Sequence, residues 1–208
     1  MAADVITTNL TDQLEIGDLI RRERLYRDLG KWDDLAELYA EDSHVRTTWF
    51  DGTGKDFAAA SKEMAEQRSR HSKHPIWPAE IRVNGDRAVS ESLAEIQNRD
   101  TLEGVWVDTT QYCRFISKLV RTECGWRFKT FEAIYQKDTI QPVYPGDVPP
   151  IDRAEVESYR ASYRIWAYML SRKGYEIPQD ERIVSEDRPD LVAKLYAEHE
   201  KWLADGTE

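Results

Sequence analysis

Two residues of this chain, Asp28 and His74, are the best suited to moving a proton. Asp28 falls at the predicted end of an amphipathic helix, just before Gly30, and His74 lies in a loop that precedes a strand. A carboxylate bound to one imidazole nitrogen fixes the ring's tautomer and raises the basicity of the other nitrogen. Such a pair can remove a proton next to a carbonyl group or an aromatic ring and return it to a departing hydroxyl.

The other histidines offer weaker chemistry. His71 is expected in a solvated basic loop with Arg70 and Lys73, His44 is expected to be structural, and His199 is expected on the surface of the last helix. No set of His, Cys and carboxylate residues has the spacing of a zinc or iron site, and no glycine-rich phosphate loop is present. The sequence therefore predicts no metal and no organic cofactor.

The elements that must position this pair follow from hydrophobic periodicity. Apolar residues recur at helical spacing over residues 11–28 and predict a first helix, which Gly30 ends. Two more helices are predicted over 33–40 and 57–68, with a strand over 45–50 between them. The expected core positions of the first helix are Leu14, Ile16, Leu19, Ile20 and Leu25.

Beyond residue 80 the pattern predicts strands. Asn84-Gly85-Asp86 is typical of a tight hairpin turn. The strand after it continues toward residue 99, and further strands are predicted over 105–121 and 126–135. Three helices with one early strand, followed by a long antiparallel meander, predict an α+β domain in which a curved antiparallel sheet covers three N-terminal helices.

Four prolines between residues 142 and 150 indicate a boundary. We therefore expect a domain over 1–144 and a helical C-terminal extension over 145–208, with helices at about 152–172 and 189–203. The first of these helices carries an aromatic face that must be covered. Because about sixty residues are few for an independent domain, the extension is expected to pack on the main domain or on a neighbouring subunit.

Composition narrows the class of partner. The chain has 29 basic and 39 acidic residues, a net charge of −10, which argues against nucleic acid or an anionic membrane as partner. The two cysteines fit no metal or redox spacing, and neither a signal peptide nor a membrane-spanning run is found, so a cytoplasmic location is expected. Seven Trp and ten Tyr indicate core packing first, and a pocket for a ring-bearing substrate second.

Several motifs, in this order and spacing, resemble the SnoaL-like group of the NTF2-like superfamily. They are the helix corner at Asp28, His74 before the strand at Ile81, Asn-Gly-Asp-Arg-Ala at 84–88, and Gly-Trp-Arg-Phe at 125–128 before Ile134-Tyr135. The resemblance covers residues 10–140. It implies a cone-shaped α+β barrel whose mouth is a deep pocket.

Similar enzymes of that superfamily are scytalone dehydratase, hexachlorocyclohexane dehydrochlorinase and bile-acid 7α-dehydratase, which use an Asp–His pair without a cofactor. The resemblance implies that Asp28 and His74 are catalytic. It departs on the last strand, where two of these enzymes carry an arginine and this chain has Phe131 and Tyr135 at the matching positions. The function implied is a cofactor-independent lyase that eliminates water, formaldehyde or a similar small group from a hydrophobic aromatic or polycyclic molecule.

Strand alternation supplies candidate pocket walls. Trp49, Asn98 and Tyr135 are the predicted substrate contacts, and Phe131 shares the face of Tyr135. Tyr26 could place a phenol near the leaving group. For each of them, ordinary core packing is an equally good interpretation.

Two other functions are consistent with the same fold. One is an isomerase or cyclase of the ketosteroid-isomerase type, which leaves the mass of the substrate unchanged. The other is a non-catalytic module that binds a small molecule, because one fold serves many functions. A homodimer or homotrimer is expected, since the aromatic face of the extension and the open side of the sheet both need cover.

Overall fold

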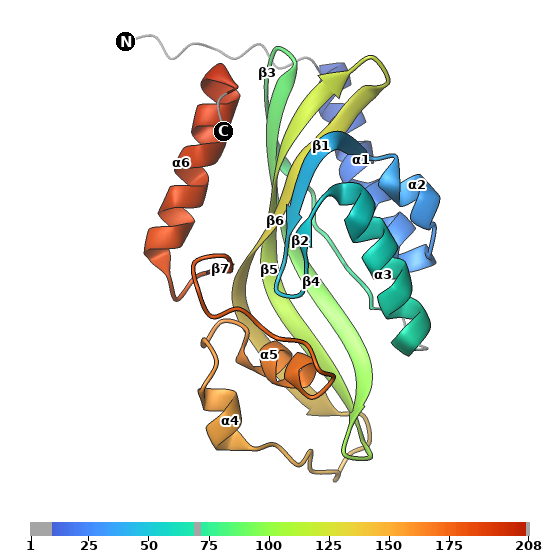
Figure 1. Cartoon of the computed structure of the whole chain (residues 1–208), viewed down its shortest axis with the longest axis vertical. Helices are drawn as coiled ribbons and strands as arrows, with labels where there is room; N and C mark the ends of the chain where they lie inside the picture. Colours follow the sequence, from blue (N-terminus) through green and yellow to red (C-terminus); the bar gives the residue numbers. More distant parts are fainter. Residues whose placement is uncertain (1–9, 69–71, 207–208) are drawn as a thin grey trace.

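The computed structural model describes residues 10–68 and 72–206 and has an α+β fold (Figure 1). In the described part of the chain, the curved sheet has the strand order β2-β1-β6-β5-β4-β3, and β7 pairs with β6. The strands are β1 (Tyr39–Arg46), β2 (Asp51–Gly52), β3 (Glu80–Asn84), β4 (Arg87–Leu102), β5 (Val105–Thr122), β6 (Gly125–Pro142) and β7 (Val184–Ser185).

Antiparallel pairing dominates the sheet. β3, β4, β5 and β6 follow one another as a meander, while β1 and β7 each pair with β6 in parallel. The three N-terminal helices lie against one face of the sheet (Figure 1). They are α1 (Leu10–Leu29), α2 (Trp32–Ala36) and α3 (Gly54–Arg68). The predicted fold class, with a curved sheet over three N-terminal helices, is confirmed.

The first strand begins and ends earlier than predicted. It starts at Tyr39 and ends at Arg46, and α2 stops at Ala36. The carbonyl of Leu38 accepts a hydrogen bond from the backbone N–H of Phe128 on β6, so pairing with the sheet begins before the predicted strand. Residues 47–50 form a turn, closed by a bond from the N–H of Thr47 to the carbonyl of Phe50 (2.8 Å).

Helix α1 presents a different face to the core from the one expected. Leu14 and Leu25 are 66% and 52% exposed, so both core assignments are wrong, whereas Ile16 and Leu19 are buried as predicted. The inward stripe continues instead through charged residues, because Glu23 lies four positions after Leu19 and therefore on the same side of the helix. Glu23 and Arg24 are both buried.

The extension packs on the sheet but not as a single long helix. The predicted helix over 152–172 is two short ones, α4 (Arg153–Glu157) and α5 (Arg164–Ser171), followed by α6 (Pro189–Asp205). In the break, the guanidinium of Arg160 donates to the carbonyls of Ile183, Gln179 and Asp180, which holds the chain out of helical conformation.

Helix α6 stands on the opposite side of the sheet from α1, α2 and α3 (Figure 1). It packs on β3, β4 and β5. The expectation that His199 is a surface residue is wrong: it is buried, and its Nδ1 donates to the carbonyl of Leu195 at 2.9 Å. None of the described helices is both long and apolar enough to cross a membrane.

Candidate active site

Asp28 is held at the end of α1 by a well-formed helix stop. Gly30 has φ = +70°, a conformation that favours glycine. The N–H of Gly30 bonds to the carbonyl of Arg27, and the N–H of Lys31 bonds to the carbonyl of Tyr26. This pair of bonds is the Schellman arrangement, and it fixes the last turn of the helix and hence the direction of the Asp28 side chain.

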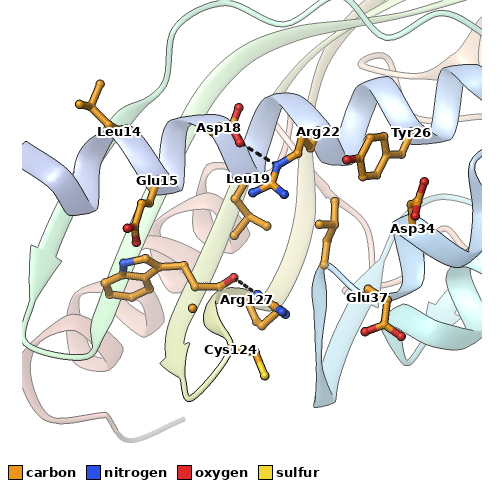
Figure 2. Close-up of a pocket in the computed structure, with 13 residues that line it drawn as sticks. Leu14, Glu15, Asp18, Leu19, Arg22, Tyr26, Asp34, Glu37, Cys124 and Arg127 are labelled. Carbon is orange, nitrogen blue, oxygen red and sulfur yellow. Dashed lines mark hydrogen bonds and ion pairs between the residues drawn. The ribbon is translucent and has the colours of Figure 1, made fainter.

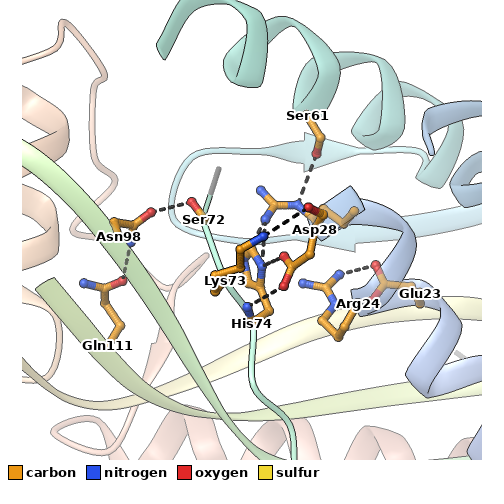
Figure 3. A network of polar contacts seen from close by, with 10 residues as sticks. Glu23, Arg24, Asp28, Ser61, Ser72, Lys73, His74, Asn98 and Gln111 are labelled. Atoms are coloured by element: carbon orange, nitrogen blue, oxygen red, sulfur yellow. Dashed lines mark hydrogen bonds and ion pairs between the residues drawn. The ribbon is translucent and has the colours of Figure 1, made fainter. Parts of the chain in front are cut away.

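His74 is positioned by pairing with the sheet and by its own contacts with Asp28. The N–H and carbonyl of Lys73 bond to Gln97 on β4, and the following Pro75 restricts His74 to extended backbone. The two carboxylate oxygens of Asp28 then bind the backbone N–H of His74 (2.8 Å) and its ring Nδ1 (2.5 Å), as Figure 3 shows. The structure therefore brings the two predicted catalytic residues into direct contact.

These bonds select the protonation state of His74. An ionised carboxylate only accepts hydrogen bonds, so Nδ1 carries the proton and Nε2 is the unprotonated nitrogen. Hydrogen bonds from His74 lower the pKa of the Asp28 carboxyl against the opposing effect of burial. Asp28 thus contacts His74 through both carboxylate oxygens.

A second group on α1, the guanidinium of Arg27, lies against the same ring. Its Nη1 is 2.6 Å from Nε2 and 3.4 Å from Nδ1 of His74. Burial, the positive charge of Arg27 and that of Arg24 together lower the pKa of His74 to about 3, although Asp28 raises it. Burial and the two arginine charges therefore oppose the basicity that Asp28 gives His74, and the role of His74 as a base stays a prediction.

Arg24 lies one turn before Asp28 on α1, and the carboxylate of Glu23 compensates its positive charge. Its guanidinium forms an ion pair with Glu23, which also accepts a bond from the hydroxyl of Tyr39 (2.7 Å). The same guanidinium lies 4.5 Å from the ring centroid of Phe131 and 5.2 Å from that of Phe115, in cation–π contact. Arg24 therefore belongs to a buried cluster with Glu23 and Tyr39.

These charged groups face a small cavity between the helices and the sheet. It measures about 20 Å³, little more than the space of one water molecule. His74, Arg24, Arg27, Ser72 and Thr47 supply its polar lining. Its largest apolar walls are Trp49, Phe57, Phe115, Phe131, Tyr135 and Trp166. The deep pocket implied by the family resemblance is thus closed by aromatic side chains in this structure.

Three of the predicted substrate contacts, Trp49, Phe131 and Tyr135, line this cavity with His74. The hydroxyl of Tyr135 accepts a bond from the N–H of Thr48 (3.2 Å) and lies 3.3 Å from the Thr48 Oγ1. The same Oγ1 accepts a bond from the indole N–H of Trp166 at 3.1 Å. The C-terminal extension, through Trp166 on α5, therefore completes the wall of the candidate site.

Asn98 lies next to the cavity rather than on its wall. Its Oδ1 accepts a bond from Ser72, a cavity residue, and its Nδ2 donates to Oε1 of Gln111 at 3.2 Å (Figure 3). The Nε2 of Gln111 is buried and has no partner within the described residues. Asn98 is therefore one residue behind the cavity lining, and its contact with a substrate stays a prediction.

Tyr26 does not face the candidate site. Two residues of separation place it far round the helix from Asp28. It lines a separate open groove of about 630 Å³ between α1, α2 and the β5–β6 hairpin, with Asp18, Arg22 and Glu37 (Figure 2). That groove is the larger hollow, but no histidine lines it. Its carboxylates are solvated, and nothing there resembles a proton-transfer pair.

The cavity lining also includes Arg24, Arg27 and Trp166, which were not among the predicted site residues. A usable signal was present for the arginines, because the stripe of Ile16, Leu19 and Ile20 continues at helical spacing into Glu23, Arg24, Arg27 and Asp28. Charged residues in a core-facing stripe break the local pattern, and such breaks are expected at functional sites. No comparable signal exists for Trp166, whose place depends on how the extension folds back.

The described residues include no group of three or more His, Cys, Asp or Glu side chains that could hold a metal ion. His71 lies outside the described residues.

Comparison with known proteins agrees with this geometry. The SnoaL-like domain family matches residues 8–132, so the chain belongs to that family, within the NTF2-like superfamily. Pea pathogenicity protein 2 of Fusarium vanettenii is 26% identical over 200 residues, covering 92% of this chain and 85% of the relative. An uncharacterized protein of Emericella nidulans is 30% identical over 199 residues, covering 88% of this chain and 82% of the relative.

Both relatives align over more residues than the family match spans, so the similarity reaches into the C-terminal extension. Among solved structures, the chain is similar to a candidate scytalone dehydratase from Novosphingobium aromaticivorans. That protein is 25% identical, with a TM-score of 0.53 over 71% of this chain and 97% of the other.

Proposed function

We propose that this protein is a cofactor-independent lyase that eliminates water from a hydrophobic, ring-bearing small molecule. The observation that carries the proposal is the contact between Asp28 and His74 on the wall of a cavity lined by aromatic rings. The similarity to a candidate scytalone dehydratase and membership of the SnoaL-like family support the same class.

The residues have distinct roles in this reaction. Nε2 of His74 removes a proton from a carbon next to a carbonyl group, and the electrons of that C–H bond form a carbon–carbon double bond. The hydroxyl on the adjacent carbon leaves with its bonding electrons and takes the proton from Nε2, giving water. Asp28 stabilises the imidazolium that exists between the two steps, and positioned acid–base groups of this kind contribute about 10²–10⁴-fold.

A guanidinium is available for negative charge on the substrate. Two similar enzymes place an arginine on the last strand, whereas this chain has Phe131 and Tyr135 there and presents Arg24 and Arg27 from α1 instead. Because Arg24 is already paired with Glu23, Arg27 is the group that can turn to the substrate.

Binding requires the cavity to open. A drug-sized ligand needs about 300–1,000 Å³, far more than the 20 Å³ present. The walls that can give way are Trp49, in the turn between β1 and β2, and Met64, an unbranched side chain on α3. Their displacement toward solvent would join the cavity to the surface without moving the sheet.

The mass of the product tests the reaction class. The wild-type protein is incubated with a panel of aryl and polycyclic ketones that carry a hydroxyl group on the carbon β to the carbonyl, each tested with and without a carboxylate on the ring, and the products are analysed by mass spectrometry. We expect at least one compound to become lighter by one water. Turnover at unchanged mass would instead show an isomerase, and tight binding without turnover would show a binding module.

A further inference from the structure

We propose that the substrate carries a carboxylate that binds Arg27, and that this contact draws the guanidinium away from His74 and so switches the base on. The inference rests on the proposed function for the role of His74. It adds a chemical class of substrate, an aromatic carboxylic acid, and a specificity-determining residue.

Arg24 and Arg27 lie on one face of α1 and differ in their ionic partners. Arg24 has a full ion pair with Glu23. Arg27 has no carboxylate within ion-pair distance in the described part of the chain, and its polar contacts are the neutral His74 and the hydroxyl of Ser61 at 3.4 Å. The carboxylates of Glu23 and Asp28 stabilise the Arg27 charge only from beyond ion-pair distance. A buried charge without a direct ion pair is costly, and an anionic ligand that forms one lowers that cost.

Two aromatic rings lie close to the Arg27 guanidinium. It lies 5.8 Å from the ring centroid of Trp49 and 5.5 Å from that of Phe57. These rings form one wall of the cavity and would contact the ring of an aromatic ligand. A planar guanidinium binds a carboxylate through two parallel N–H bonds, so one group would both attract and orient the acid.

A ligand carboxylate bound to Arg27 would also change the charge around His74. The described titratable groups near this imidazole are Asp28, Arg24 and Arg27 on α1 and the neighbouring Lys73. Of these, Arg27 is the one whose guanidinium touches Nε2. A carboxylate that neutralises this charge and draws it aside leaves Asp28 as the dominant neighbour, and a carboxylate beside an imidazole favours its protonation.

Benzoate and benzamide are the probes that test this. They have the same shape and differ in charge, so their dissociation constants, measured by calorimetry on the whole chain, report the preference for an anion. We expect benzoate to bind about tenfold more tightly or better, the effect of a charged hydrogen bond. NMR titration of His74 should show that saturating benzoate raises its pKa, whereas benzamide leaves it unchanged.

Three variants locate the effect. Arg27→Gln should bind the two probes equally, and Arg27→Lys should keep part of the preference because it retains the charge. Arg22→Gln is the matched control, since Arg22 lies on the same helix and forms an exposed pair with Asp18, and it should behave as the wild type. Equal binding of the two probes by the wild type, or no binding of either, would overturn the inference.

Failure of the proposed function gives a different result. If His74 is not a catalytic base, benzoate still binds better than benzamide and the His74 pKa still rises, but removal of His74 leaves turnover intact. If the anion site is absent, the probe preference is missing whether or not His74 is needed for turnover. Neither probe has to react, so the two tests are independent.

Discussion

Replacing Asp28 with Asn should lower kcat by about 10²–10⁴-fold, the contribution of a positioned acid–base group. An ionised carboxylate accepts from both the backbone N–H and Nδ1 of His74. An amide of the same size has one accepting oxygen, so it leaves one of these donors unpaired or turns the imidazole to the wrong tautomer. The measurement is steady-state kinetics on a compound identified by the product-mass screen.

The control for this variant is Asp18→Asn on the same helix. Asp18 is exposed and pairs with Arg21 and Arg22, so its loss removes a similar charge far from His74. It should leave kcat within about twofold of the wild type, because exposed ion pairs contribute little. Equal rates for the wild type and for Asp28→Asn would show that Asp28 does not orient the base.

The largest loss of stability is expected from Glu23→Ala. This change leaves the Arg24 guanidinium buried without its partner and removes the acceptor for the hydroxyl of Tyr39. Removing one member of a buried ion pair costs about 3–5 kcal/mol of unfolding free energy, since the remaining charge is uncompensated. Urea unfolding followed by circular dichroism measures the change.

A double variant separates the stranded charge from the loss of packing. Glu23→Leu combined with Arg24→Met removes both charges and keeps the side-chain volume, so it should be much more stable than Glu23→Ala. Asp18→Ala, at an exposed ion pair, should lose less than about 1 kcal/mol. If the double variant is as unstable as Glu23→Ala, the cluster acts through packing alone and the account of Arg24 as a compensated charge is wrong.

The parts of the fold that depend on local pattern could be predicted from the sequence. Asn84-Gly85-Asp86 forms the β3–β4 hairpin turn, where Gly85 has φ = +61°, and Gly30 ends α1. The break between α4 and α5 could not be predicted in the same way. It depends on Arg160 reaching carbonyls of residues 179–183, which are distant in sequence and brought near only by the folded extension.

The candidate site divides along similar lines. Asp28 and His74 could be paired because their spacing matches a family order, and Phe131 and Tyr135 could be placed from strand alternation. Trp49 lines the cavity from the turn after β1, since that strand ends at Arg46 and not at residue 50 as predicted. The cavity lining includes neither Tyr26 nor Asn98. The helix angle turns Tyr26 away from Asp28, and strand alternation does not say where along β4 the cavity ends. The charges around His74 could not be predicted from the sequence either, because they depend on the Arg27 guanidinium contacting the imidazole rather than pointing into solvent.

Proton removal from carbon by His74 is the central claim, and hydrogen exchange measures it most directly. A substrate found in the product-mass screen is incubated in D₂O with the wild-type protein or with His74→Ala, and proton NMR follows the hydrogen on the carbon next to the carbonyl group. We expect the wild-type protein to remove that hydrogen or replace it with deuterium, and His74→Ala to be slower by about 10²-fold or more. Equal rates of loss with the two proteins would contradict the claim, whatever group the reaction releases.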